Sequence, residues 1–336
     1  MDNSSQSNST AKSKHNTCRL QSDYRLTSLT SRNNNKTRLK DIMMMSSKVA
    51  AILLLSVMLS STIANNSTTT IVSKRGKIKK TGEYKYFYDS SVPAACESVY
   101  IFGVGTAMSV NDYNELGSTI STGNRIVALV SDATPGNPVK LQEGPWIRYY
   151  NTIVTQIQDI IPACVDTPDP IILFGGHSAS GQGIVNALPN VVPQPNGLVF
   201  LSPFKITKKM KINPSIPTLN WGFEKTTCSV SVNNAAKAAY ELSSPNHRVL
   251  YRIDNEDNTI THCIFTDNGC MGFICPKGKE GEWVIPAVSK SIQIFANDII
   301  DDGKLTRTQF DLDVVKDGKV QLYVNEESTN ANTKSE

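Results

Sequence analysis

The chain has 336 residues, of which 39% are hydrophobic, so it can form the core of one large α/β domain or of two small ones. Its net charge of +4 is too small to favour nucleic acid as a partner. Much of the basic excess lies in the stretch KRGKIKK, residues 74–80. Such a stretch is typical of a solvated linker, with a basic patch for an anionic surface or a processing site as alternatives.

The amino-terminal part of the chain predicts an export signal. Residues 1–48 are rich in serine and asparagine and are expected to be disordered. Residues 49–64 form a short apolar run that follows Lys48 and ends at Ala64, which is typical of a cleaved secretory signal. We therefore expect the protein to be secreted or to lie in an endomembrane lumen. A cleaved signal is expected if translation begins at Met43, Met44 or Met45, and a signal anchor that holds the protein in a membrane is the alternative.

The remaining chain predicts one α/β domain. Residues 65–82 are expected to form a linker, and 83–88 an edge strand that opens a domain over 83–300. Buried strands and helices then alternate, which predicts a mostly parallel, twisted sheet with helices on both faces. Residues 301–336 are expected to form a hairpin around 316–319 and a polar tail. The expected strands cover 98–102, 125–130, 171–174, 197–201, 217–222 and 248–253, and the expected helices include 146–161, 232–242 and 283–300.

The cysteines favour disulfides. Six of them follow the predicted signal, and an even number in an exported chain is typical of paired cysteines. The close spacing of Cys263, Cys270 and Cys275 indicates at least one local bridge, although spacing does not give the pairing. No C-x-x-C pair is present, so no metal site is expected.

The candidate nucleophile is Ser178, in the run GGHSASG after the strand 171–174. In a nucleophile elbow the serine lies in a strained turn between a strand and a helix, and the residues two positions away must be small. Here these residues are Gly176 and Ser180, so a serine replaces the usual second glycine. A structural strand-to-helix turn without chemistry is the alternative.

The candidate base follows by elimination among four histidines. His15 precedes the predicted signal, His177 is expected to pack beneath the elbow, and His247 precedes its strand. His262 follows the strand 248–253, on the edge of a parallel sheet where ligands bind, so we expect it to accept the proton of Ser178.

The candidate acid is Glu224, the carboxylate in the turn after the strand 217–222, in the chain order serine, acid, histidine. Competing carboxylates follow other strands: Asp254, Glu256, Asp257 and Asp132. An oxyanion formed at Ser178 would be held by the backbone N–H of Ala179 and by that of Gly105 or Thr106, in the glycine-containing turn after the strand 98–102.

Three stretches carry a resemblance to a known family: GGHSASG, PTLNWGFEKTTC and THCIFTD. They resemble the chlorophyllase and polyester-hydrolase (cutinase-like) branch of the α/β-hydrolases, approximately over residues 84–298. The resemblance implies an α/β-hydrolase fold and hydrolysis of the phytol ester of chlorophyll without a cofactor. Relatives typically have an aspartate shortly after the glycine of the 217–222 strand. This chain has Thr226 and Thr227 there, so Glu224 would be a shifted replacement.

These patterns together predict a secreted, monomeric serine ester hydrolase that acts on a small hydrophobic ester through an acyl-enzyme. A lipase or cutinase-type carboxylesterase is the alternative enzyme. A non-catalytic binding protein on a hydrolase fold is the alternative of another class. The segment 202–216 carries four lysines and could cap the active site, contact a membrane surface or form a solvated face.

Overall fold

The computed structural model describes residues 69–78, 82–92, 96–132, 142–160, 164–165, 169–223, 232–254, 259–270, 278, 281–301 and 305–324. All of them belong to the compact unit Ser67–Glu336. The predicted disordered segment, the predicted signal and the carboxy-terminal tail after residue 324 lie outside the described residues. Within the described residues, no helix has the length and apolar character needed to cross a membrane.

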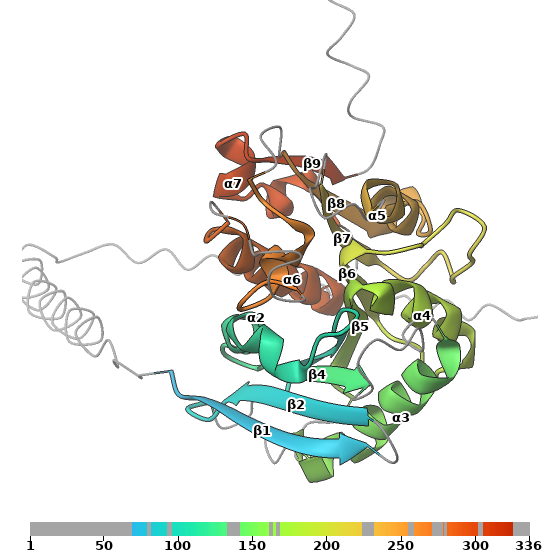
Figure 1. Ribbon diagram of the computed structural model, residues 1–336, viewed down its shortest axis with the longest axis vertical. Coiled ribbons are helices and arrows are strands. Elements are labelled where there is room, and N and C mark those ends of the chain that lie inside the picture. Colours follow the sequence, from blue (N-terminus) through green and yellow to red (C-terminus); the bar gives the residue numbers. More distant parts are fainter. Residues whose placement is uncertain are drawn as a thin grey trace, which may run out of the picture. The chain divides into compact units, whose positions relative to one another are not determined.

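In the described residues the strands form one nine-stranded sheet in the order β1-β2-β4-β3-β5-β6-β7-β8-β9 (Figure 1). The six strands from β4 to β8 in this order are parallel, and β1, β2 and β9 join antiparallel at the two sides. The expected mostly parallel sheet is thus confirmed. The strands are β1 (Ile71–Ile78), β2 (Gly82–Asp89), β3 (Ser98–Gly103), β4 (Arg125–Asp132), β5 (Ile171–Ser178), β6 (Gly197–Pro203), β7 (Thr218–Phe223), β8 (Arg248–Ile253) and β9 (Val320–Val324).

Helices cover both faces of the sheet because alternate strand residues point to opposite sides. In β3, for example, Tyr100 and Phe102 belong to one core cluster, and Val99 and Ile101 belong to the other. The first cluster packs against α2 (Asn114–Ile120) and α6 (Val284–Asp301). The second packs against α3 (Glu143–Ile160), α4 (Ala179–Ala187) and α5 (Val232–Tyr240), as Figure 1 shows.

Two expectations for the amino-terminal side of the domain are wrong. The predicted linker 65–82 contains β1, which pairs antiparallel with β2 along its whole length. The predicted edge strand is therefore an inner strand, because β2 lies between β1 and β4. The polar sequence of β1 hides its strand character, since its central residues Ser73, Lys74 and Arg75 are exposed.

The expected hairpin at residues 316–319 is also wrong. The segment forms α7 (Asp313–Lys316), a turn at Gly318 with φ of 71°, and β9. Instead of pairing with a strand of its own hairpin, β9 pairs with β8 and extends the sheet. The α/β domain consequently continues from β1 to β9, beyond the expected end at residue 300.

The described residues contain two disulfides. Cys96, before β3, is bonded to Cys164, after α3. Cys263 is bonded to Cys270, which confirms the expected local bridge. Cys228 and Cys275 lie outside the described residues.

The approach of β5 to β6 gives a first prediction. A Cβ at Gly175 would lie 1.7 Å from the carbonyl oxygen of Val199, so Gly175→Ala forces the two strands apart. We expect it to lower the free energy of unfolding in urea by about 3 kcal/mol. The control is Gly144→Ala in the first turn of α3, where the Cβ meets nothing within 4 Å. It should raise the free energy of unfolding by about 0.5–1 kcal/mol. Equal changes in both variants would contradict this account of the strand contact.

Candidate active site

Ser178 ends β5 and immediately precedes α4, as the elbow pattern predicts. Its φ of 58° and ψ of −127° place a residue with a Cβ in a sparsely populated backbone region. Such strain costs about 1–3 kcal/mol and is concentrated at functional sites. The side chain is half-buried, and its hydroxyl does not cap α4. A serine whose hydroxyl is not needed for the helix end is available for chemistry.

The two small neighbours of Ser178 are required by close packing against β3. A Cβ at Gly176 would lie 2.5 Å from the carbonyl oxygen of Gly103. Ser180, which takes the place of the usual second glycine, is fully buried. Its Oγ lies 2.8 Å from the Gly103 carbonyl oxygen and 2.7 Å from that of His177. The serine at this position therefore fits because its hydroxyl bonds to the backbone that surrounds the elbow.

Backbone strain gathers at the carboxyl ends of the parallel strands. Besides Ser178, non-glycine residues with positive φ occur at Ala107 after β3, at Ser202 near the end of β6 and at Lys205 just beyond it, while Asp169 precedes β5. Parallel strands end at the same edge of a sheet, which is also where α/β proteins bind ligands. The strain thus marks the same edge as the predicted nucleophile.

His262 lies at this edge, at the start of the 3-10 helix η6 (His262–Phe265). The ring is 4% exposed, and its Nδ1 lies 2.7 Å from the Oγ of Ser202. Burial lowers the pKa of His262 to about 4. The imidazole is therefore neutral at pH 7, which is the form that can accept a proton.

A buried hydrogen-bond chain links three loops at this edge. Nε2 of His177 donates to the carbonyl oxygen of His262 at 3.0 Å, which fixes the ring proton on Nε2. The hydroxyl of Tyr113 then donates to Nδ1 of His177 at 2.7 Å and accepts the N–H of Gly105 at 2.9 Å. His177 is fully buried, as expected, and its ring lies 4.4 Å from that of His262 between centroids. The elbow, the β3 turn and the His262 loop thus form one connected unit.

The loop that carries His262 has two further anchors. The disulfide Cys263–Cys270 closes it, and the carboxylate of Asp267 accepts the backbone N–H groups of Asn114 and Glu115 at 2.9 and 3.0 Å. These N–H groups begin α2, where a carboxylate is favourable. The main chain of the base is therefore held in place from both sides of the loop.

The predicted oxyanion donors differ in their present contacts. Ala179 is the first residue of α4, and the positive end of the helix dipole lies at its N–H. The N–H of Gly105 already donates to Tyr113, whereas Thr106 lies beside it on the exposed side of the turn. Thr106 is consequently the better candidate of the two predicted donors in this turn.

The predicted acid, Glu224, lies outside the described residues, as do Glu256 and Asp257. The residue before it, Phe223, ends β7 and packs against Phe265, with ring centroids 6.0 Å apart. Phe223 thus contacts the loop that carries His262. The other competitors also lie at this edge: Asp254 follows β8 and is half-buried, and Asp132 ends β4.

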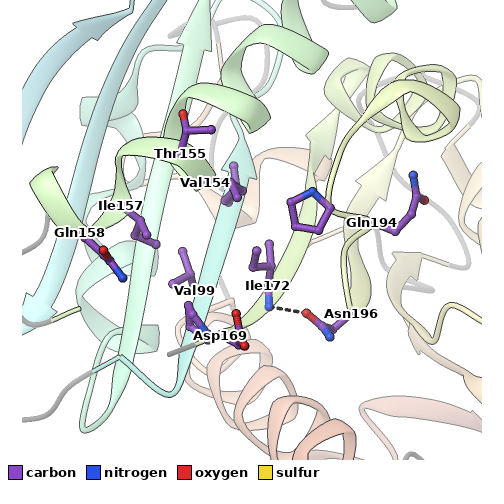
Figure 2. A pocket seen from close by; sticks show the side chains of 12 residues that line it. Val99, Val154, Thr155, Ile157, Gln158, Asp169, Ile172, Gln194 and Asn196 are labelled. Carbon is purple, nitrogen blue, oxygen red and sulfur yellow. Dashed lines mark hydrogen bonds between the residues drawn. The ribbon is translucent and has the colours of Figure 1, made fainter. Parts of the chain in front are cut away.

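A cavity of about 440 Å³ lies at the opposite end of the sheet (Figure 2). Val99 of β3, Ile172 of β5 and Val154 of α3 line it, and Asn196 accepts the N–H of Ile172 at 2.8 Å. Ile172 and Ser178 are six residues apart on one strand, a distance of about 20 Å. This cavity is thus separate from the elbow.

The segment 202–216 packs onto the sheet by its apolar residues. Ile206 and Ile216 are buried in the core cluster that contains α4 and α5. Its lysines are exposed, and Lys208 forms an ion pair with Glu241 at 2.5 Å. Of the three predictions for this segment, these contacts favour a solvated face of lysines, with the apolar residues of the segment packed beneath it.

Ser202 is a candidate residue that the sequence patterns did not identify. It follows the buried run 197–201 at the expected edge, which is the one signal that could have pointed to it. Its contact with His262 depends on an irregularity in the pairing of β5 with β6, where His177 pairs with Leu201 but Ser178 pairs with Pro203. A one-residue irregularity of this kind has no sequence signature here.

Compared with known proteins, the chain matches no family model, and no curated protein matches it significantly.

Proposed function

We propose that this chain is a serine ester hydrolase of the α/β-hydrolase type, with Ser178 as nucleophile and His262 as base. The observation that carries the proposal is the strained backbone of Ser178 at the strand-to-helix junction, next in sequence to His177, whose ring lies 4.4 Å from that of the buried His262. The carbonyl oxygen of Ser178 accepts the N–H of Phe204 at 2.9 Å, and two residues earlier Ser202 bonds to His262. Nucleophile and base are thus tied to the same short segment at the end of β6, residues 202–204.

The proposed reaction follows from these positions. His262 takes the proton of the Ser178 hydroxyl while Oγ attacks the carbonyl carbon of the ester. The negative oxygen of the tetrahedral intermediate is held by the N–H groups of Ala179 and Thr106. As the intermediate collapses, His262 gives its proton to the leaving alcohol, and the acyl group stays on Ser178. His262 then takes a proton from water as the water oxygen attacks the acyl carbon. When this second tetrahedral intermediate collapses, His262 gives that proton to Oγ of Ser178 and the carboxylic acid is released.

Glu224 remains the proposed acid of the site. Phe223, the residue before Glu224, packs against Phe265 of the His262 loop, with ring centroids 6.0 Å apart. A carboxylate near an imidazole stabilises the imidazolium that forms during the reaction.

Active-site labelling tests the proposal. A fluorophosphonate probe should label wild-type protein at Ser178, and Ser178→Ala should abolish labelling and lower kcat/KM by at least about 1,000-fold. Ser215→Ala is the matched control, since Ser215 lies exposed in the segment after β6, and it should label normally. Mass spectrometry of the labelled peptide identifies the site. Folded wild-type protein that is not labelled would favour a non-catalytic binding protein.

The substrate class has its own test. For a chlorophyllase-like enzyme, purified protein should hydrolyse both short p-nitrophenyl esters and chlorophyll, releasing chlorophyllide and phytol. Hydrolysis of the p-nitrophenyl esters alone would assign a lipase or cutinase-type carboxylesterase instead. Chromatography of the pigment products distinguishes the two results.

The pKa of His262 predicts the pH dependence. Burial lowers this pKa from 6.5 to about 4, and the neutral ring is the active form. Activity should therefore be constant above pH 6 and should decline as the pH falls through about 4. The measurement is the pH profile of kcat/KM, which reports the free enzyme. A decline centred near pH 6.5 would contradict this prediction.

A further inference from the structure

We infer that Ser202 is the positioning residue of this site: its buried hydroxyl holds Nδ1 of His262 and thereby turns the ring toward Ser178. This inference rests on the proposed function, because it assigns a role within the same site. The contact is short, 2.7 Å between Oγ and Nδ1, and both side chains are buried, at 0% and 4% exposure. Both groups are thus shielded from bulk solvent, where the loss of a hydrogen-bond partner is costly.

The backbone of Ser202 is strained in a way that presents this hydroxyl. Its φ is 43°, in the left-handed region that serine rarely adopts. The residue occupies the place where the pairing of β5 and β6 shifts, so that Ser178 pairs with Pro203. In a regular strand Ser202 would pair with Ser178. Its side chain would then point to the face of the sheet set by the alternation of side chains along β6. The irregularity instead leaves Ser202 as the extra residue beside the elbow.

Ser202 is unsuited to be a nucleophile, which separates its role from that of Ser178. It is fully buried, whereas Ser178 is half-buried at the start of α4. A buried hydroxyl can nevertheless accept Nδ1–H of a neutral imidazole. In this tautomer the lone pair is on Nε2, which can take a proton, as a serine hydrolase requires.

The main chain and the ring of His262 are held by different groups. His177 of β5 bonds to the carbonyl oxygen of His262, and its ring packs on the His262 ring. Tyr113 of η1 (Val110–Tyr113) lies behind His177 and bonds to it. The hydrogen bond from His177 fixes the main chain of His262 and involves no nitrogen of the His262 ring. The Ser202 hydroxyl contacts a ring nitrogen and so opposes rotation of the ring.

The test uses Ser202→Gly, which removes the hydroxyl and also relieves the left-handed strain, so the protein should remain folded with a Tm within about 5 °C of wild type. We expect kcat on p-nitrophenyl butyrate to fall by about 100-fold with little change in KM, and fluorophosphonate labelling of Ser178 to slow in parallel. The matched control is Ser243→Ala, which removes another buried serine hydroxyl, bonded to the carbonyl oxygen of Ile216 at 2.6 Å. Its kcat should stay within twofold of wild type.

Ser202→Asp adds a readout that a purely structural role would not change. A carboxylate against Nδ1 should restore part of the rate lost in Ser202→Gly and move the acid limb of kcat/KM upward by at least about 1 pH unit. Rates of Ser202→Gly within twofold of wild type, or an unshifted acid limb in Ser202→Asp, would overturn the inference. If Glu224→Gln lowers kcat more than Ser202→Gly does and also shifts the acid limb of kcat/KM, the orienting role belongs to Glu224. Wild-type protein that neither hydrolyses esters nor labels at Ser178 would instead refute the proposed function.

Discussion

The close approach of β5 to its two neighbours is the constraint on which this site depends. Glycines at 175 and 176 let the strand pass within contact of the backbones of β6 and β3, and the chain then reverses at Ser178 into α4. The left-handed conformation of Ser178 is unfavourable by about 1–3 kcal/mol on its own. It persists because Ser180 bonds to the end of β3 and because Phe204 bonds to the carbonyl oxygen of Ser178. A side chain on either glycine would disturb all of these contacts together.

The parts of the fold that are buried on both faces could be predicted from the sequence. Strands such as 171–174 and 197–201 are continuous apolar runs, because both faces of a central parallel strand are covered by helices. Strand β1 could not be predicted in this way, since it lies at the edge of the sheet and its exposed residues make it look like a linker. The sequence predicts β9 as half of a hairpin, because the glycine turn at 318 is formed by residues close together in the chain. The pairing of β9 with β8 instead joins residues that are far apart in the chain.

The candidate site also has parts that could be predicted from the sequence and parts that could not. The elbow at Ser178 and the placement of His262 after a carboxyl strand end follow from chain order and local composition, and the structure brings both to one edge of the sheet. The roles of Tyr113 and Ser202 follow from contacts between residues 60 or more positions apart, 64 for Tyr113 with His177 and 60 for Ser202 with His262. No spacing rule within a single strand or helix predicts such contacts. They arise from how strands stack side by side, which only the folded chain reveals.

The basic residues of β1 have a consequence for how copies of this protein meet. A strand at the border of a sheet presents unpaired backbone groups that invite another chain to add a strand. Lys74 and Lys77 are exposed along β1, so a second copy laid against this border in antiparallel fashion would bring these like charges together. Arg75, between them, forms an ion pair with Glu83. The two lysines would thus oppose the addition of a second β1 along this border.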